Sequence, residues 1–246
     1  MKEPLRTRSL SIDYSSTMPT SILVINPNSS QSVTDGLTST LAAPPETSLT
    51  FYTAPANAPP SINDVTGGTL SAAICFQNIV EKGLIEEYDG FLVSCFSEHP
   101  LIPMLRDATR KPVIGILQAA IAQALLCGQR FGIVATGAGY RYDRHAEVRN
   151  VLGGSSDRFA GMVATGLGVV ELREGDRQHV ESSMKKASGA LAGLGADVLI
   201  MGCAGMAGME ELVQSGVKDA GFGFVRVVDG NKAGVEMVGA LIRLSK

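Results

Sequence analysis

The sequence predicts an α/β protein in which parallel strands are joined by crossover helices. Short β-branched apolar runs alternate with helix-like stretches, and turn residues separate the two, which is the pattern of a parallel sheet. Most of the strand candidates are apolar throughout, as expected for strands that are buried on both faces. The chain has 246 residues, 45% of them hydrophobic and 18% charged, so it is long enough to bury a substantial core as one large domain or two small lobes.

The apolar runs define eight strands, in chain order 21–25, 48–52, 90–94, 113–116, 130–134, 158–163, 197–201 and 224–228. Helix candidates lie between or after them at 67–82, 101–109, 119–126, 140–151, 175–193, 209–215 and 232–245. After the first strand, one of Ser29, Ser30 and Ser32 is expected to cap a further helix. Residues 44–63 hold five of the eleven prolines, which indicates a loop-rich excursion that can act as a lid.

Composition and charge exclude several classes of protein. A formal charge of −3 leaves no basic surplus for nucleic acid or for anionic lipid. The four cysteines are too few for a disulfide scaffold, and none lies in a CxxC pair or a Cys/His cluster with metal spacing, so we expect no metal and a reducing compartment. No apolar run is long enough for a membrane helix and no signal peptide is visible. These features predict a cytoplasmic protein, with residues 1–19 as a disordered tail.

Two cysteines occupy matching positions. Phe-Leu-Val-Ser-Cys-Phe-Ser at 91–97 and Val-Leu-Ile-Met-Gly-Cys-Ala-Gly at 198–205 each place a cysteine, Cys95 or Cys203, immediately after a predicted strand. Ligands of open α/β sheets bind outside the carboxyl ends of the strands, so both thiols are expected where chemistry happens. The repeated arrangement indicates two similar lobes that face one another.

Two opposed thiols suit a racemase. Inverting a carbon next to a carbonyl requires removal of a proton from one face and delivery of a proton to the other. An unperturbed thiol pKa of about 8.5 lies close to working pH, so a thiolate and a thiol can coexist. Helix N-termini after each cysteine would stabilise the thiolate. Because no lysine lies in a pyridoxal-type context, we expect no cofactor, and backbone N–H groups would stabilise the enolate.

Four segments resemble the aspartate/glutamate/hydantoin racemase superfamily, and most closely its hydantoin and allantoin racemase branch. They are residues 22–30 (Ile-Leu-Val-Ile-Asn-Pro-Asn-Ser-Ser), 94–97 (Ser-Cys-Phe-Ser), 115–120 (Gly-Ile-Leu-Gln-Ala-Ala) and 202–206 (Gly-Cys-Ala-Gly-Met). The matching segments occur in the same order as in the family, from about Ser21 to the C-terminus. Within the family, the sequence resembles fungal-type members. Retention of both cysteines makes it more specific than any single motif.

The resemblance implies two pseudo-symmetric α/β lobes, each a mostly parallel sheet flanked by helices, with the ligand cleft between them. The first lobe would comprise 20–116 plus 227–246, and the second 117–226. Cys95 and Cys203 would be the acid/base pair. The substrate would be lined by Asn26, Phe96, Thr136, Ala204 and Gly205, with Asp229 nearby. Gln118, at a position that is commonly acidic in the family, would contact a ring N–H. Relatives of this kind are generally homo-oligomeric.

Other polar residues have plainer interpretations. Cys75 and Cys127 lie within predicted helices and are expected to be small buried hydrophobes. His99 is expected to orient a loop or cap a helix rather than donate protons. Adjacent residues 143–145 (Asp-Arg-His) point in different directions on a helix, which favours a solvated face. The glycine-rich stretches 165–168 and 202–208 lack the frame of a dinucleotide-binding loop.

The predicted function is racemisation of a 5-substituted hydantoin or of allantoin. Three alternatives stay open from the sequence. The same fold can carry decarboxylation or cis–trans isomerisation of a diacid, although retention of both thiols disfavours this. It can also serve as a non-catalytic small-molecule sensor. A biosynthetic epimerase of a larger cyclic amide is the third alternative, because Phe96 and the proline-rich segment can enclose bulk.

Overall fold

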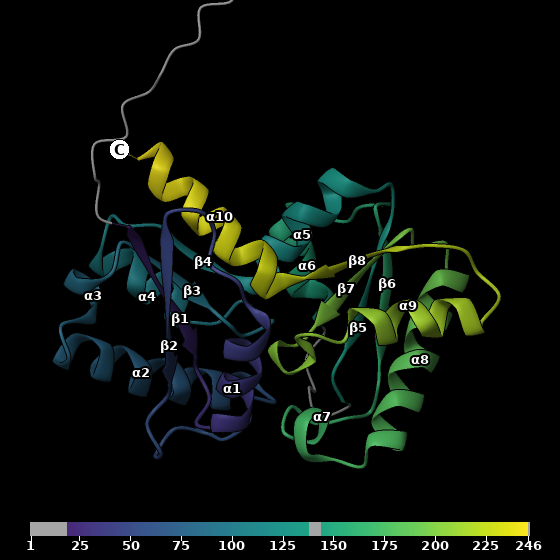
Figure 1. Cartoon of the computed structure of the whole chain (residues 1–246), viewed down its shortest axis with the longest axis horizontal. Coiled ribbons are helices and arrows are strands. Elements are labelled where there is room, and N and C mark those ends of the chain that lie inside the picture. Colours follow the sequence, from purple (N-terminus) through teal and green to yellow (C-terminus); the bar gives the residue numbers. More distant parts are fainter. Residues whose placement is uncertain (1–18, 138–143, 246) are drawn as a thin grey trace, which may run out of the picture.

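The computed structural model describes residues 19–137 and 144–245 and contains two parallel four-stranded sheets (Figure 1). The first has the order β2-β1-β3-β4, with β1 (Thr20–Asn26), β2 (Thr47–Thr53), β3 (Gly90–Val93) and β4 (Val113–Gly115). The second has the order β6-β5-β7-β8, with β5 (Phe131–Ala135), β6 (Phe159–Ala164), β7 (Val198–Gly202) and β8 (Arg226–Asp229). The α/β class is therefore confirmed, and all eight predicted strands occur within two residues of the expected limits. Apart from Pro19, the predicted tail lies outside the described residues.

Helices join and flank the strands. In chain order they are α1 (Gln31–Thr40), α2 (Val65–Glu81), α3 (Leu84–Glu87), α4 (Leu101–Ala108), α5 (Ile116–Cys127), α6 (Arg144–Leu152), α7 (Glu171–Glu174), α8 (Arg177–Gly193), the 3₁₀ turn η1 (Ala204–Met206), α9 (Glu210–Asp219) and α10 (Gly230–Leu244). Asp64 and Asp176 begin α2 and α8 as side-chain caps, each accepting a hydrogen bond from a backbone N–H three residues on. None of the described helices is long and apolar enough to cross a membrane.

The burial of a strand follows its place in the sheet. The central strands β3, β5 and β7 are buried along their whole length. The edge strand β2 instead alternates between partly buried and exposed residues before the buried Tyr52, and β6 is mostly half-buried. The expectation that most strands are fully buried is therefore too broad, because an apolar run does not reveal whether its strand lies at an edge.

Several helix boundaries differ from the sequence prediction, and two of the differences have a clear structural cause. Ile116, predicted as the end of a strand, begins α5, because the strand stops at Gly115 and that residue has the extended backbone of a helix N-cap. The helix predicted over 175–193 begins two residues later, as α8, and the short helix α7 before it was not predicted. Gly175 leaves helical geometry with a ψ of 176° and separates α7 from α8.

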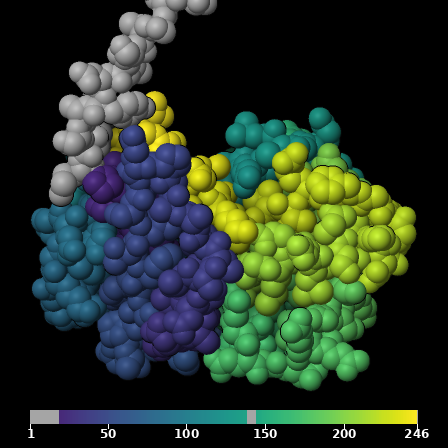
Figure 2. Space-filling view, viewed as in Figure 1, coloured from purple at the N-terminus to yellow at the C-terminus, as the bar shows by residue number. Residues whose placement is uncertain are grey.

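The last strand and the last helix lie on different halves of the molecule. β8 pairs with β7 in the second sheet, whereas the predicted division between 226 and 227 cuts through this strand after its first residue. The chain leaves the second sheet only after Asp229, and α10 then packs along β3 and β1 and against α5. The fit is close, because a Cβ on Gly234 would lie 2.4 Å from the Leu92 side chain. Figures 1 and 2 show α10, in yellow, crossing the junction between the two halves.

Candidate active site

The carboxyl ends of the central strands of both sheets open into one cleft. In the first sheet β1 and β3 are neighbours, and β2 and β4 lie on opposite sides of this pair. In the second sheet β5 and β7 are neighbours, with β6 and β8 on opposite sides, so the strand order reverses direction at the centre of each sheet. Such a switch point is where open α/β sheets bind ligands. The cleft is lined by Asn28, Ile62, Ser94, Cys95, Phe96, Thr136, Arg144, Val169, Gly202, Cys203 and Ala204. It therefore brings together Cys95 and Cys203, which follow corresponding strands.

Cys95 lies two residues after Val93, the last residue of β3, and is partly exposed. Its Sγ lies 3.2 Å from Ser97 Oγ, and either atom can be the donor. The Ser97 backbone N–H donates to the Cys95 carbonyl at 3.0 Å, which keeps this two-residue turn tight. Desolvation inside the cleft raises the pKa of the Cys95 thiol, whereas the hydrogen bond from Ser97 and the positive charge of Arg144 lower it.

Cys203 is buried, and its backbone is extended with a φ of −158° as it begins η1. The Gly205 backbone N–H donates to Cys203 Sγ at 3.3 Å. A Cβ at this position would make a tight contact, 3.1 Å from the Val169 carbonyl oxygen, so glycine fits here without strain. Desolvation raises the pKa of Cys203 to about 11, against the opposing effects of the Gly205 N–H and of Arg144 and Arg173.

The predicted substrate contacts divide into two groups. Phe96, Thr136 and Ala204 line the cleft with the thiols. Gly205 acts on Cys203 rather than on the cleft wall, and Asn26 is fully buried beneath the cleft. Asn26 Nδ2 donates to the Ser30 carbonyl and to Thr34 Oγ1, and its Oδ1 accepts from the Asn28 N–H. Its observed role is therefore to shape the turn after β1, and Asn28 is the residue that reaches the cleft.

Gln118 is outside the cleft lining. Its Oε1 accepts from Arg106 Nη2 at 3.2 Å and from the Gly115 N–H at 3.5 Å, so the side chain closes the first turn of α5. A residue in the third position of a helix commonly reaches back to the N-cap in this way. In this structure Gln118 therefore caps a helix, and the predicted contact to a ring N–H has no counterpart in the cleft lining.

Three polar residues of the cleft were not among the predicted contacts: Asn28, Ser94 and Arg144. Ser94 precedes Cys95, and its buried Oγ has no hydrogen-bond partner among the described residues. Arg144 was expected on a solvated helix face, but it begins α6 and donates from Nη1 to the Phe96 carbonyl at 3.2 Å. The position of Ser94 beside Cys95 was a usable signal. Arg144 had none, because its approach to the cleft depends on how α6 packs.

A second arginine lies on the Cys203 side. Arg173, in α7, donates from Nη2 to the Ala207 carbonyl at 2.8 Å and lies against Gly36, where a Cβ would be 2.6 Å from its guanidinium carbon. Asp229, predicted near the substrate, is buried at the start of α10 and accepts a 2.8 Å hydrogen bond from the Asn231 N–H. Burial lowers the pKa of Arg173, whereas the negative charges of Cys203 and Asp229 raise it.

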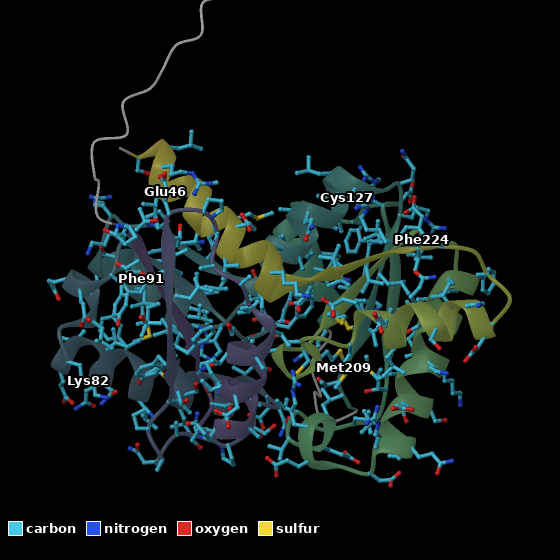
Figure 3. All side chains as sticks on the ribbon, viewed as in Figure 1. Glu46, Lys82, Phe91, Cys127, Met209 and Phe224 are labelled. Carbon is cyan, nitrogen blue, oxygen red and sulfur yellow. The ribbon has the colours of Figure 1, made fainter. Side chains whose placement is uncertain are left out.

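The remaining cysteines and histidines have structural positions. Cys75 is buried in α2, as predicted, but Cys127 is exposed because it is the last residue of α5 (Figure 3). His99 is buried and accepts a hydrogen bond from the Leu101 N–H through Nδ1, which fits the predicted capping role. His145 is exposed and packs edge-on against Phe159, while Asp143 lies outside the described residues. In the two described ranges, no group of three or more His, Cys, Asp and Glu side chains is placed to hold a metal ion.

Fold and cleft together define a class of protein: two matched parallel sheets that each present a cysteine to one shared small-molecule cleft. A sequence model of the Asp/Glu/hydantoin racemase family matches residues 22–238. The chain belongs to this family, and the predicted superfamily and branch are confirmed.

Individual relatives extend the match to most of the chain. An uncharacterized protein of Schizosaccharomyces pombe is 37% identical over 227 residues, which cover 91% of this chain and 92% of that protein. A hydantoin racemase of a Pseudomonas species is 28% identical over 227 residues, covering 92% and 87%. The structure of allantoin racemase from Klebsiella pneumoniae is similar with a TM-score of 0.77 and 28% identity, covering 92% of this chain and 89% of that one.

Proposed function

We propose that the protein is a cofactor-independent racemase of a 5-substituted hydantoin or of allantoin, with Cys95 and Cys203 as its acid/base pair. One observation carries the proposal: the two cysteines follow corresponding strands, β3 and β7, and both line the same cleft. Similarity to hydantoin and allantoin racemases supports the substrate class.

The reaction moves one proton onto the enzyme and another off it. The thiolate of one cysteine takes the proton from the carbon next to the carbonyl, and the electron pair of the broken C–H bond passes to the carbonyl oxygen as an enolate. The thiol of the other cysteine then donates its proton to the opposite face of the same carbon. The product has inverted configuration, and the two cysteines have exchanged protonation states. Proton exchange with water restores the starting form.

The enolate requires donors inside the cleft. Ser94 Oγ is buried, lines the cleft and has no partner among the described residues, so its hydroxyl is available to the enolate oxygen. Thr136, Asn28 and the side chain of Arg144 supply further polar contacts around the ring. Phe96, Ile62 and Val169 cover the apolar part of the cleft and keep water away from the carbanion.

Deuterium incorporation from heavy water tests the proposal. Enantiopure allantoin and 5-alkylhydantoins are incubated with wild type, Cys95→Ala, Cys203→Ala and, as a matched control for the loss of a thiol, Cys127→Ala. Wild type and control are expected to racemise the substrate with incorporation of deuterium. Each active-site variant keeps one base, so it is expected to lose racemisation and to exchange only the enantiomer whose proton faces the remaining thiol. Racemisation at the wild-type rate by either variant would refute the two-thiol assignment.

The two-lobe division, the cytoplasmic location and the homo-oligomeric state belong to the same proposal. We place the boundary between lobes at the passages into α5 and α10, where the chain crosses from one sheet to the other. Sedimentation of the purified protein measures the oligomeric state.

A further inference from the structure

Arg144 has an unusual position for a charged residue. It is the first residue of α6, which belongs to the half of the molecule that carries Cys203, yet it donates from Nη1 to the carbonyl of Phe96, the residue after Cys95. Among the described residues that line the cleft, it alone carries a formal charge at neutral pH. Its guanidinium therefore reaches the loop that holds Cys95, inside the cleft that Cys203 also lines.

Both thiols need such a charge. Desolvation raises the pKa of each thiol, and the pKa of Cys203 is about 11 with the nearby cations included, so the thiolate form needs further stabilisation wherever a cation can supply it. A fixed cation beside a buried thiol favours its ionised form. Arg144 lowers the pKa of both Cys95 and Cys203, whereas Arg173 acts on Cys203 only.

The other charged groups around the thiols do not replace Arg144. Glu147, in α6, accepts a hydrogen bond from the Glu98 N–H, and its negative charge raises the pKa of Cys95. Asp229 is a buried acid on the Cys203 side and interacts with Arg173. Burial lowers the pKa of His99 to about 4, so this side chain is neutral at working pH. Arg144 is thus the described cation that acts on both sulfurs.

We propose that Arg144 is the shared counter-ion of Cys95 and Cys203, a positioning residue that holds the negative charge of the cleft on either sulfur. The inference deepens the proposed function, on which it rests for its catalytic meaning. In each turnover the negative charge passes from one sulfur to the other. A cation coupled to one thiol alone would favour one half of the reaction and oppose the return. A cation coupled to both keeps the two forms of the enzyme close in free energy.

The test measures thiol reactivity without any substrate. Alkylation by iodoacetamide requires the thiolate, so the rate at each cysteine reports its ionisation. Rates at pH 8 are measured by peptide mass spectrometry for wild type, Arg144→Ala, Arg144→Gln, Arg144→Lys and the matched control Arg173→Ala. A rise of one pKa unit is expected to slow alkylation roughly three- to tenfold, because a more basic thiolate is also more nucleophilic.

We expect Arg144→Ala and Arg144→Gln to slow the alkylation of both Cys95 and Cys203. Arg144→Lys should restore most of the alkylation rate, and Arg173→Ala should slow alkylation of Cys203 alone. Exposed Cys127 is the internal reference. Unchanged rates in Arg144→Ala, slowing of one thiol only, or full rescue by the uncharged glutamine would overturn the proposal. Deuterium exchange on the same variants separates the two claims. Paired slowing of alkylation in a protein that exchanges no hydantoin proton would sustain the counter-ion and reject the racemase.

Discussion

His99 is expected to make the protein sensitive to acid. Its imidazole is 1% exposed, and burial lowers its pKa to about 4 from 6.5. The pKa of His99 is lower in the folded chain than in the unfolded chain. The stabilising contribution of the neutral imidazole is therefore complete above pH 6.5 and is lost as the pH falls toward 4. The unfolded chain takes up a proton in this window, while the folded chain does not. At pH 4.5 the two pKa values correspond to a loss of about 2.5 kcal/mol in the free energy of unfolding. This is a large share of the roughly 5–15 kcal/mol that is typical for the unfolding of a domain.

His99→Asn removes the titration but keeps an acceptor for the Leu101 N–H. Urea unfolding at pH 7 and pH 4.5 gives the loss of stability for each protein. Wild type is expected to lose about 2.5 kcal/mol more than the variant over this interval. His179→Asn, with an exposed side chain on α8, controls for the removal of a histidine as such. Equal losses in wild type and His99→Asn would refute the inference that His99 is buried as the neutral form.

Three further predictions concern packing, specificity and pH. Gly216→Ala places a Cβ 2.4 Å from the Lys185 Cα in the neighbouring helix, so urea unfolding should show a loss of about 1–3 kcal/mol, whereas Gly223→Ala enters open space and should not. Gln118→Leu should leave KM within about twofold of wild type in the exchange assay, because the side chain lies outside the cleft; a large rise would return Gln118 to the substrate site. The racemisation rate should rise up to about tenfold per pH unit from pH 6 to 8, since burial raises the pKa of Cys203 to about 11; a flat profile would contradict thiolate chemistry.

The strands and the cysteine pair were predictable because both depend on short stretches of sequence. An apolar run followed by a polar or cysteine-containing turn reveals a buried parallel strand and its functional end, as at 91–97. The predictions that failed concern features that depend on contacts between distant segments of the chain. β8 joins the second sheet through its pairing with β7, and Arg144 reaches the cleft through the packing of α6.

Contacts that the sequence does not reveal also explain why some predicted site residues do not line the cleft. Gln118 and Asn26 lie in recognisable motifs, but their hydrogen bonds close a helix turn and a loop. Cys127 follows a run of apolar residues but is exposed, because it is the last residue of α5. Sequence periodicity predicts which face of an element is buried better than it predicts where that element stops.

The two thiols share a strand position but have different hydrogen-bond partners. The Gly205 N–H can only donate to Cys203, which favours negative charge on that sulfur, whereas the Ser97 hydroxyl can either donate to Cys95 or accept from it. The resting enzyme is therefore expected to accumulate in one of its two proton arrangements. The two enantiomers of a substrate with one stereocentre have equal free energy, so kcat/KM must be the same for both. The asymmetry at the two sulfurs then shows as a faster kcat for one enantiomer, offset in proportion by a higher KM.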